Sequence, residues 1–202
     1  MSICPYRKEA LEAIARKVIS QYDPRLLHAP SPIPVESIIE QVYGLTMEFQ
    51  FIRSNGRVLG ETVFETAMVP IYERDRGGYK LIPVKAGTVI IDASLIHNRG
   101  DGRFRFTCAH ELAHWVLHKE FYTQRGETAA MTSVVRSSET DAAIERQADR
   151  LGCYLLMPKG AVKMAFYNTN GSAGNKTTAL AELFGVSRQA MQIRLEEMRL
   201  LP

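Results

Sequence analysis

Long hydrophobic runs are absent from this 202-residue sequence. No apolar stretch approaches the roughly 18 residues that span a bilayer, and the first residues lack the apolar core of a signal peptide. Cysteine is scarce as well. Cys4, Cys108 and Cys153 contain no C-x-x-C pair, which argues against a disulfide framework and a cysteine-built zinc site. We therefore expect a cytoplasmic protein with no membrane partner, in which Cys108 and Cys153 are small buried apolar residues.

An excess of charge is also lacking. The formal net charge is +3, which is too weak to indicate a nucleic-acid partner by itself. With 46% hydrophobic and 23% charged residues, the composition is that of an ordinary globular protein. The length suffices for one domain with a full hydrophobic core and a small appendage.

Hydrophobic periodicity predicts helices, then strands, then helices. The expected helices are residues 5–22, 35–43, 102–118 and 140–157, followed by two short C-terminal helices. The expected strands lie in residues 45–51, 58–72 and 79–92, with a long polar loop at 123–139 and a linker at 168–175. This order predicts an α+β fold with a small antiparallel or mixed sheet. We expect a main domain at residues 1–168 and C-terminal helices at 176–202, packed on it.

The most informative motif is an H-E-x-x-H run formed by His110, Glu111 and His114. Successive helical residues advance by about 100°, so histidines four apart project from nearly the same side. Both imidazoles can then bind one zinc ion, with Glu111 beside them as a candidate proton acceptor.

The helix expected at 140–157 offers a third ligand. Glu145 and Asp149 are four apart and therefore share a face. Glu145 can complete the coordination sphere, and Asp149 can accept the remaining ring N–H of a ligand histidine. Small residues, Ala148 and Gly152, would let this helix lie close to the first. The alternative is a solvated acidic face, since arginines at 146 and 150 interrupt it.

Taken together, these stretches resemble the ImmA/IrrE family of zinc metallopeptidases. Residues 106–118 resemble its F-T-x-A-H-E-x-x-H-x-x-L-H signature, residues 145–158 its E-x-x-A-N/D…L-L-M-P helix, and residues 183–195 its L-F-x-V-S…R-L tail. The resemblance implies a thermolysin-like, gluzincin-like core with a zincin-type pair of helices. It further implies proteolysis of helix-turn-helix repressors, which relieves repression of mobile-element or stress-response genes, an anti-repressor role in transcription regulation.

Carried over by position, the resemblance makes His110, His114 and Glu145 the zinc ligands and Glu111 the catalytic glutamate. Cys108 and the run Leu151-Gly152-Cys153 depart from the family's usual residues, which affects packing around the site rather than the ligand set.

The oxyanion stabiliser is left open. Its candidates are His118, Tyr122 and Tyr154, although His118 is better interpreted as a hydrogen-bonded core histidine. We also expect an extended substrate to add along the sheet edge near Thr88–Ile91.

Two other functions remain open at this point. Residues 178–195 also fit a helix-turn-helix, in which the side chains of Arg188, Gln189, Gln192 and Arg194 would read DNA bases. The competing interpretation is that these helices pack on the core or dock the substrate. A third possibility is a zinc-binding anti-repressor that displaces a repressor without cutting it. For the peptidase and for the anti-repressor, we expect the repressor to be a separate polypeptide encoded nearby.

Overall fold

The structure, a computed structural model, describes residues 6–98, 101–125 and 139–201. The helices within these ranges are α1 (Lys8–Tyr22), α2 (Val35–Ser37), α3 (Gly102–Arg125), α5 (Glu139–Leu156), α6 (Lys159–Asn168), α7 (Ala173–Phe184) and α8 (Arg188–Glu197), with short turns η1 (Pro24–Leu27), η2 (Ile38–Val42) and η3 (Ala93–Asn98). The strands are β1 (Thr46–Gln50), β2 (Gly60–Val63), β3 (Ala67–Glu73), β4 (Gly78–Val84) and β5 (Thr88–Asp92).

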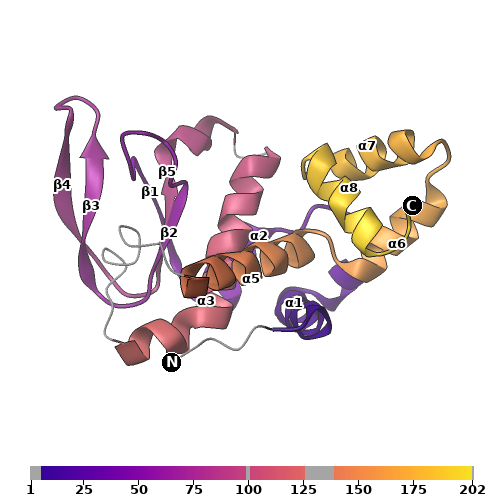
Figure 1. Cartoon of the computed structure of the whole chain (residues 1–202), viewed down its shortest axis with the longest axis horizontal. Helices are drawn as coiled ribbons and strands as arrows, with labels where there is room; N and C mark the ends of the chain where they lie inside the picture. The colour runs from indigo at the N-terminus through magenta and orange to yellow at the C-terminus, as the bar shows by residue number, and fades with distance from the viewer. Residues whose placement is uncertain (1–5, 99–100, 126–138, 202) are drawn as a thin grey trace.

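The strands form two small sheets at one end of the molecule (Figure 1). In the three-stranded sheet β5 is central, parallel to β1 and antiparallel to β2. Strands β3 and β4 form a separate antiparallel hairpin. The hairpin packs on the first sheet through a small apolar cluster, which consists of Ile52, Val63, Val69, Val84 and Ile90. The predicted α+β class with a small mixed sheet is confirmed.

Two features of the strand prediction are wrong. The apolar runs at 58–72 and 79–92 each contain two strands, because the chain turns between them, with Gly87 in the left-handed region at φ 80°. Apolar content alone does not reveal such turns. The substrate edge expected near Thr88–Ile91 is also wrong, because β5 is hydrogen-bonded to a strand on both sides.

Helix boundaries differ from the expected ones at several points. Helix α1 begins at Lys8, and the segment expected as one helix at 35–43 contains a single α-turn followed by the π-helical turn η2. Helix α3 continues to Arg125, so only part of the predicted loop at 123–139 remains, and most of it lies outside the described residues. The linker is shorter than expected because Ser172 caps α7, accepting a hydrogen bond from the backbone of Asn175.

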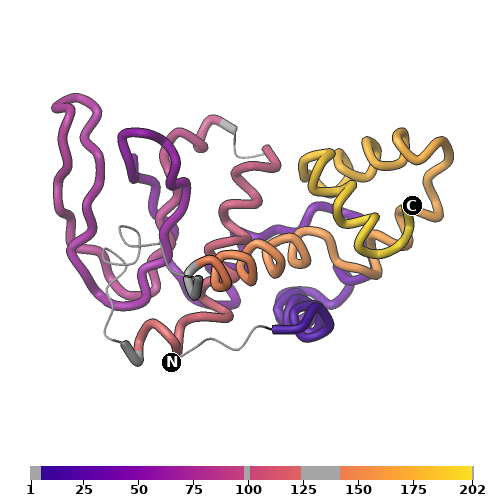
Figure 2. Tube along the Cα trace, viewed as in Figure 1, coloured from indigo at the N-terminus to yellow at the C-terminus, as the bar shows by residue number. Residues whose placement is uncertain are grey.

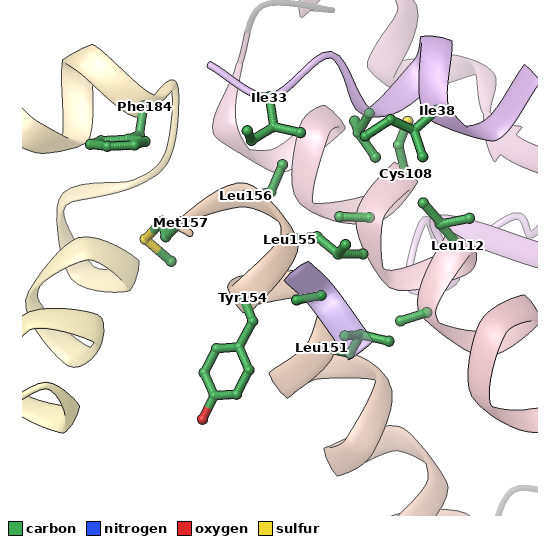
Figure 3. Close-up of a cluster of buried hydrophobic side chains, with 14 of the residues drawn as sticks. Ile33, Ile38, Cys108, Leu112, Leu151, Tyr154, Leu155, Leu156, Met157 and Phe184 are labelled. Atoms are coloured by element: carbon green, nitrogen blue, oxygen red, sulfur yellow. The ribbon is translucent and has the colours of Figure 1, made fainter. Parts of the chain in front are cut away.

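The main core surrounds the α3–α5 pair (Figure 3). Leu112 and Cys108 of α3 pack with Leu151 and Leu155 of α5, and all four side chains are fully buried. A Cβ atom at Gly152 would lie 3.3 Å from the backbone nitrogen of His110. The expected close approach of the two helices at this small residue is therefore confirmed, and it places the two motifs side by side.

The C-terminal helices share this core. Leu180, Phe184, Met191 and Leu195 are buried in the same cluster as α1, α3 and α5. The trace in Figure 2 shows α6, α7 and α8 gathered at the end of the molecule opposite the hairpin. Arg105 of α3 joins the parts by donating hydrogen bonds to the carbonyl oxygens of Gly185 and Ile33.

Among the described residues, no helix combines the length and apolar character needed to cross a membrane.

Candidate metal centre

Helix α3 presents His110 and His114 on one side, as their spacing predicts. Their Nε2 atoms lie 2.9 Å apart, and their ring centroids lie 4.6 Å apart. His114 is buried, whereas the side chain of His110 keeps 14% of its surface exposed. The two imidazoles thus converge on a single point that is open to solvent on one side.

Helix α5 brings Glu145 to the same point. Its Oε2 lies 3.3 Å from Nε2 of His110, and its Oε1 lies 3.5 Å from Nε2 of His114. Ligands held at about 2.0–2.1 Å from a tetrahedral zinc ion lie about 3.3 Å from one another. The spacing of these three donors therefore fits a zinc ion, and two nitrogens with one carboxylate are a donor set that zinc accepts.

Asp149 lies one helical turn beyond Glu145 and orients His110. Its Oδ1 is 2.9 Å from Nδ1 of His110, so that nitrogen donates its proton, and in the neutral ring Nε2 carries the lone pair that a metal ion would bind. Burial alone would lower the pKa of His110. The hydrogen bonds to Asp149 and Glu145 and the charge of Glu111 outweigh it and raise this pKa to about 10. The site therefore attracts positive charge, whether a proton or a metal ion.

Glu111 lies against strand β2, and two residues there were missed by sequence reasoning. The hydroxyl of Thr62 lies 2.8 Å from Oε2 of Glu111 and 3.0 Å from its main-chain oxygen. A Cβ atom at Gly60 would lie 2.5–2.8 Å from the Glu111 side chain. Residues 60 and 62 share one face of the strand, and together they form the surface against which this carboxylate, 4% exposed, is held.

His118 is not one of the side chains that converge on the candidate metal site. Its Nδ1 is 3.2 Å from Nδ1 of His114, on the side of that ring away from the metal donors, and the residue is 1% exposed. Burial, and next the neighbouring His114, lower its pKa to about 3. The expectation of a hydrogen-bonded core histidine is confirmed, and the alternative role as oxyanion stabiliser is wrong.

The hydroxyl of Tyr154 is directed away from the metal donors. Tyr154 follows Glu145 by nine residues, half a revolution around α5, and its hydroxyl donates to Oε1 of Glu197 at 2.7 Å. Burial raises its pKa above the usual value. Tyr154 as oxyanion stabiliser is therefore wrong. Tyr122 is buried and stacks on Phe64, with ring centroids 4.7 Å apart. Its catalytic role stays a prediction.

The four C-terminal candidates for DNA reading separate into two groups. Arg188, Gln189 and Gln192 are exposed on α8. Arg194 is 2% exposed, lies over the ring of Tyr154 and donates to the carbonyl oxygen of Met157. It cannot reach a DNA groove, so this assignment is wrong. A signal was present in the sequence, since residue 194 falls on the apolar face that includes residues 191 and 195.

Neither Cys108 nor Cys153 forms a disulfide within the described part of the chain. Cys108 is fully buried, as expected, whereas Cys153 is half-buried. Burial, with the charge of Asp149 second, raises the pKa of Cys153 to about 11, so this thiol is not a reactive nucleophile at neutral pH.

These observations define a class of protein: an α+β chain in which an H-E-x-x-H helix and a glutamate from a second helix can hold a divalent metal ion. The family model for the IrrE N-terminal-like domain, a peptidase model, matches residues 88–196, more than half of the chain. The chain belongs to this family, and the resemblance inferred from its motifs is confirmed.

No curated protein matches the sequence closely enough to count as a relative. Among solved structures, the fold is similar to that of a Mycobacterium tuberculosis transcriptional regulator, with a TM-score of 0.51 and 15% identity over 92% of this chain. The matched region covers 55% of that protein, so the chain spans little more than half of its length. At this identity the similarity shows a shared fold alone.

Proposed function

We propose that this protein is a zinc-dependent endopeptidase. The observation that carries the proposal is the convergence of His110, His114 and Glu145 on one point, with the carboxylate of Glu111 on the adjacent residue of the same helix. Membership of a peptidase family supports this assignment. The carboxylates that raise the pKa of His110, those of Asp149, Glu145 and Glu111, also favour a bound cation.

His110, His114 and Glu145 would hold the zinc ion, which would lower the pKa of a bound water and polarise a substrate carbonyl. Glu111 is the general base that takes the proton from the attacking water, and it then delivers this proton to the departing amine. Thr62 donates to the carboxylate of Glu111 and fixes its orientation. Since β2 carries this contact, an extended substrate segment running beside β2 would bring its peptide bond to Glu111.

The substrate in this proposal is a helix-turn-helix repressor encoded nearby, as the family resemblance implies, and the reaction takes place in the cytoplasm. Cleavage would separate the DNA-binding part of the repressor from the rest and relieve repression.

A single substitution tests the peptidase assignment. Glu111→Gln keeps all three proposed ligands but has no base, so we expect full zinc content and a loss of cleavage of at least about 10²-fold. Mass spectrometry of the neighbouring repressor after incubation detects the new terminus. Glu120→Gln, an exposed change on the same helix, is the matched control. Undiminished cleavage by Glu111→Gln would contradict the proposal.

A second candidate function is DNA binding through α8, as a transcriptional regulator. The exposed positions of Arg188, Gln189 and Gln192 favour it, and the fold neighbour is named a transcriptional regulator. The burial of Arg194 removes one of its four proposed contacts. A gel shift at several salt concentrations distinguishes it, because sequence-specific retention of DNA by the purified chain requires no protease activity.

A further inference from the structure

His118 is a buried polar residue that the proposed chemistry does not use. It lies one turn beyond His114 on α3, and the Nδ1 atoms of the two rings are 3.2 Å apart. Its Nε2 has no accessible surface and makes no hydrogen bond of standard geometry among the described residues. Burying an imidazole costs free energy unless its nitrogen atoms make hydrogen bonds. The contact with His114 is therefore the feature to explain.

The position of the proton on His114 gives the explanation. Nε2 of His114 faces His110 and Glu145, so a bound metal ion requires a lone pair on that atom. A neutral imidazole then carries its proton on Nδ1, and this N–H needs an acceptor. Within the described part of the chain, the acceptor at hydrogen-bond distance is Nδ1 of His118. His118 must accordingly be neutral, with its own proton on Nε2.

The opposite side of His118 faces α5. Gln147, which is 5% exposed, lies in that helix and interacts with the His118 ring. Its amide atoms have no accessible surface and, like Nε2 of His118, make no hydrogen bond of standard geometry to the residues that the structure describes. An amide oxygen is a suitable acceptor for an imidazole N–H. A chain of contacts from Gln147 through His118 to His114 therefore connects α5 with α3, the two helices that carry the metal donors.

The two ligand histidines are supported by different groups. His110 donates to the carboxylate of Asp149, whose side chain is 55% exposed. His114 donates to a neutral ring in the core. A neutral acceptor fixes the tautomer of His114 without placing another carboxylate beside this ligand.

We propose that His118 is a positioning residue that accepts the Nδ1 proton of the zinc ligand His114 and thereby fixes its Nε2 toward the metal. The inference rests on the metal centre of the proposed function but requires no substrate. In this role the functional atom of His118 is Nδ1. If the residue only filled space, the identity of that atom would not matter.

Three substitutions separate these roles, and zinc affinity is measured by competition with a chromogenic chelator. His118→Asn retains a polar acceptor near the position of Nδ1, and His118→Leu is nearly isosteric with Asn but has no acceptor. His118→Gln places its polar group farther out, near Nε2. We expect a loss of zinc affinity of about 10–100-fold for Leu and Gln, with most of the affinity restored in Asn. His97→Asn, an exposed change in η3, is the control.

A measurement on the unmodified protein covers the case in which the Leu variant does not fold. Nuclear magnetic resonance of isotope-labelled histidine in the zinc-loaded chain reports each tautomer. We expect protons on Nδ1 of His114 and on Nε2 of His118. A proton on Nδ1 of His118, or equal zinc affinities of the Asn and Leu variants, overturns the inference.

The outcomes distinguish this inference from the function that it deepens. A wild-type chain that binds zinc and cleaves nothing contradicts the peptidase proposal and leaves the role of His118 standing if Asn and Leu differ. A wild-type chain that binds no zinc overturns both.

Discussion

At the scale of the residue, His110 shows how the site exchanges a proton for a metal ion. Its pKa is about 10 in the folded chain, against an ordinary value of 6.5. The buried ring would favour the neutral form, but Asp149, Glu145 and Glu111 surround it with negative charge. Near neutral pH the metal-free site therefore holds a proton on His110, and a metal ion must displace it.

This exchange predicts how zinc affinity depends on pH. Because the folded-state pKa is raised, His110 is protonated below about 10, and zinc binding near neutral pH releases a proton. The apparent Kd should fall about tenfold for each unit of rising pH in this range. Calorimetry in two buffers of different ionisation enthalpy counts the released protons. Asp149→Asn, which removes the first of the raising interactions, should reduce the count, and a wild-type count of zero would contradict the assignment.

The residues of the centre differ in how far sequence could predict them. Spacing of four along a helix was sufficient for the pairs at 110 and 114 and at 145 and 149, because helix geometry is local. Gly60 and Thr62 could not be found in this way. They lie about 50 positions before Glu111 in the chain, and only the pairing of β2 with β5 brings them to it. No local pattern encodes such a contact.

At the scale of the element, strand β2 and helix α3 fit together because residue 60 has no side chain. The glycine here is required by the close approach of the Glu111 side chain and not by its backbone angles. The sequence pattern identified β2 only as part of a longer apolar run, since periodicity reports which face is buried and not where a turn divides the run. The helices were better predicted, because small residues and caps mark their contacts and ends.

Substitution of this glycine tests the fit. In Gly60→Ala the new methyl group would collide with the Glu111 carboxylate, which must move. A displacement of about 1 Å can lower a rate by about 10²-fold, so we expect a fall of that order in kcat with zinc content unchanged. Single-turnover cleavage and metal analysis provide the two readouts. Gly78→Ala, where a Cβ atom meets nothing within 4 Å, is the control. Equal losses in both variants would indicate general destabilisation instead.

At the scale of the whole molecule, one apolar cluster includes side chains from α1, α3, α5, α7 and α8. The metal donors come from the two helices at its centre, and the C-terminal helices complete it. Arg194 strengthens this connection, since its guanidinium contacts Glu12 of α1 at 2.6 Å and Glu197 of α8 at 3.4 Å. The division into residues 1–168 and 176–202 stays a prediction, and this shared core indicates that both parts unfold together.

Metal binding should therefore stabilise the entire chain in one step. Free zinc at about 100 times its Kd adds about 2.7 kcal/mol to the free energy of unfolding. For a chain of this size the expected rise in Tm is on the order of 5–10 °C. Scanning calorimetry with zinc and with a chelator measures the shift, and Glu145→Gln, which replaces the anionic ligand with a neutral amide, should abolish most of it. Two separate unfolding transitions, only one of which shifts with zinc, would show that the C-terminal helices form an independent unit. Helices that share one core with the metal centre unfold in the same transition, so zinc would shift the unfolding of both.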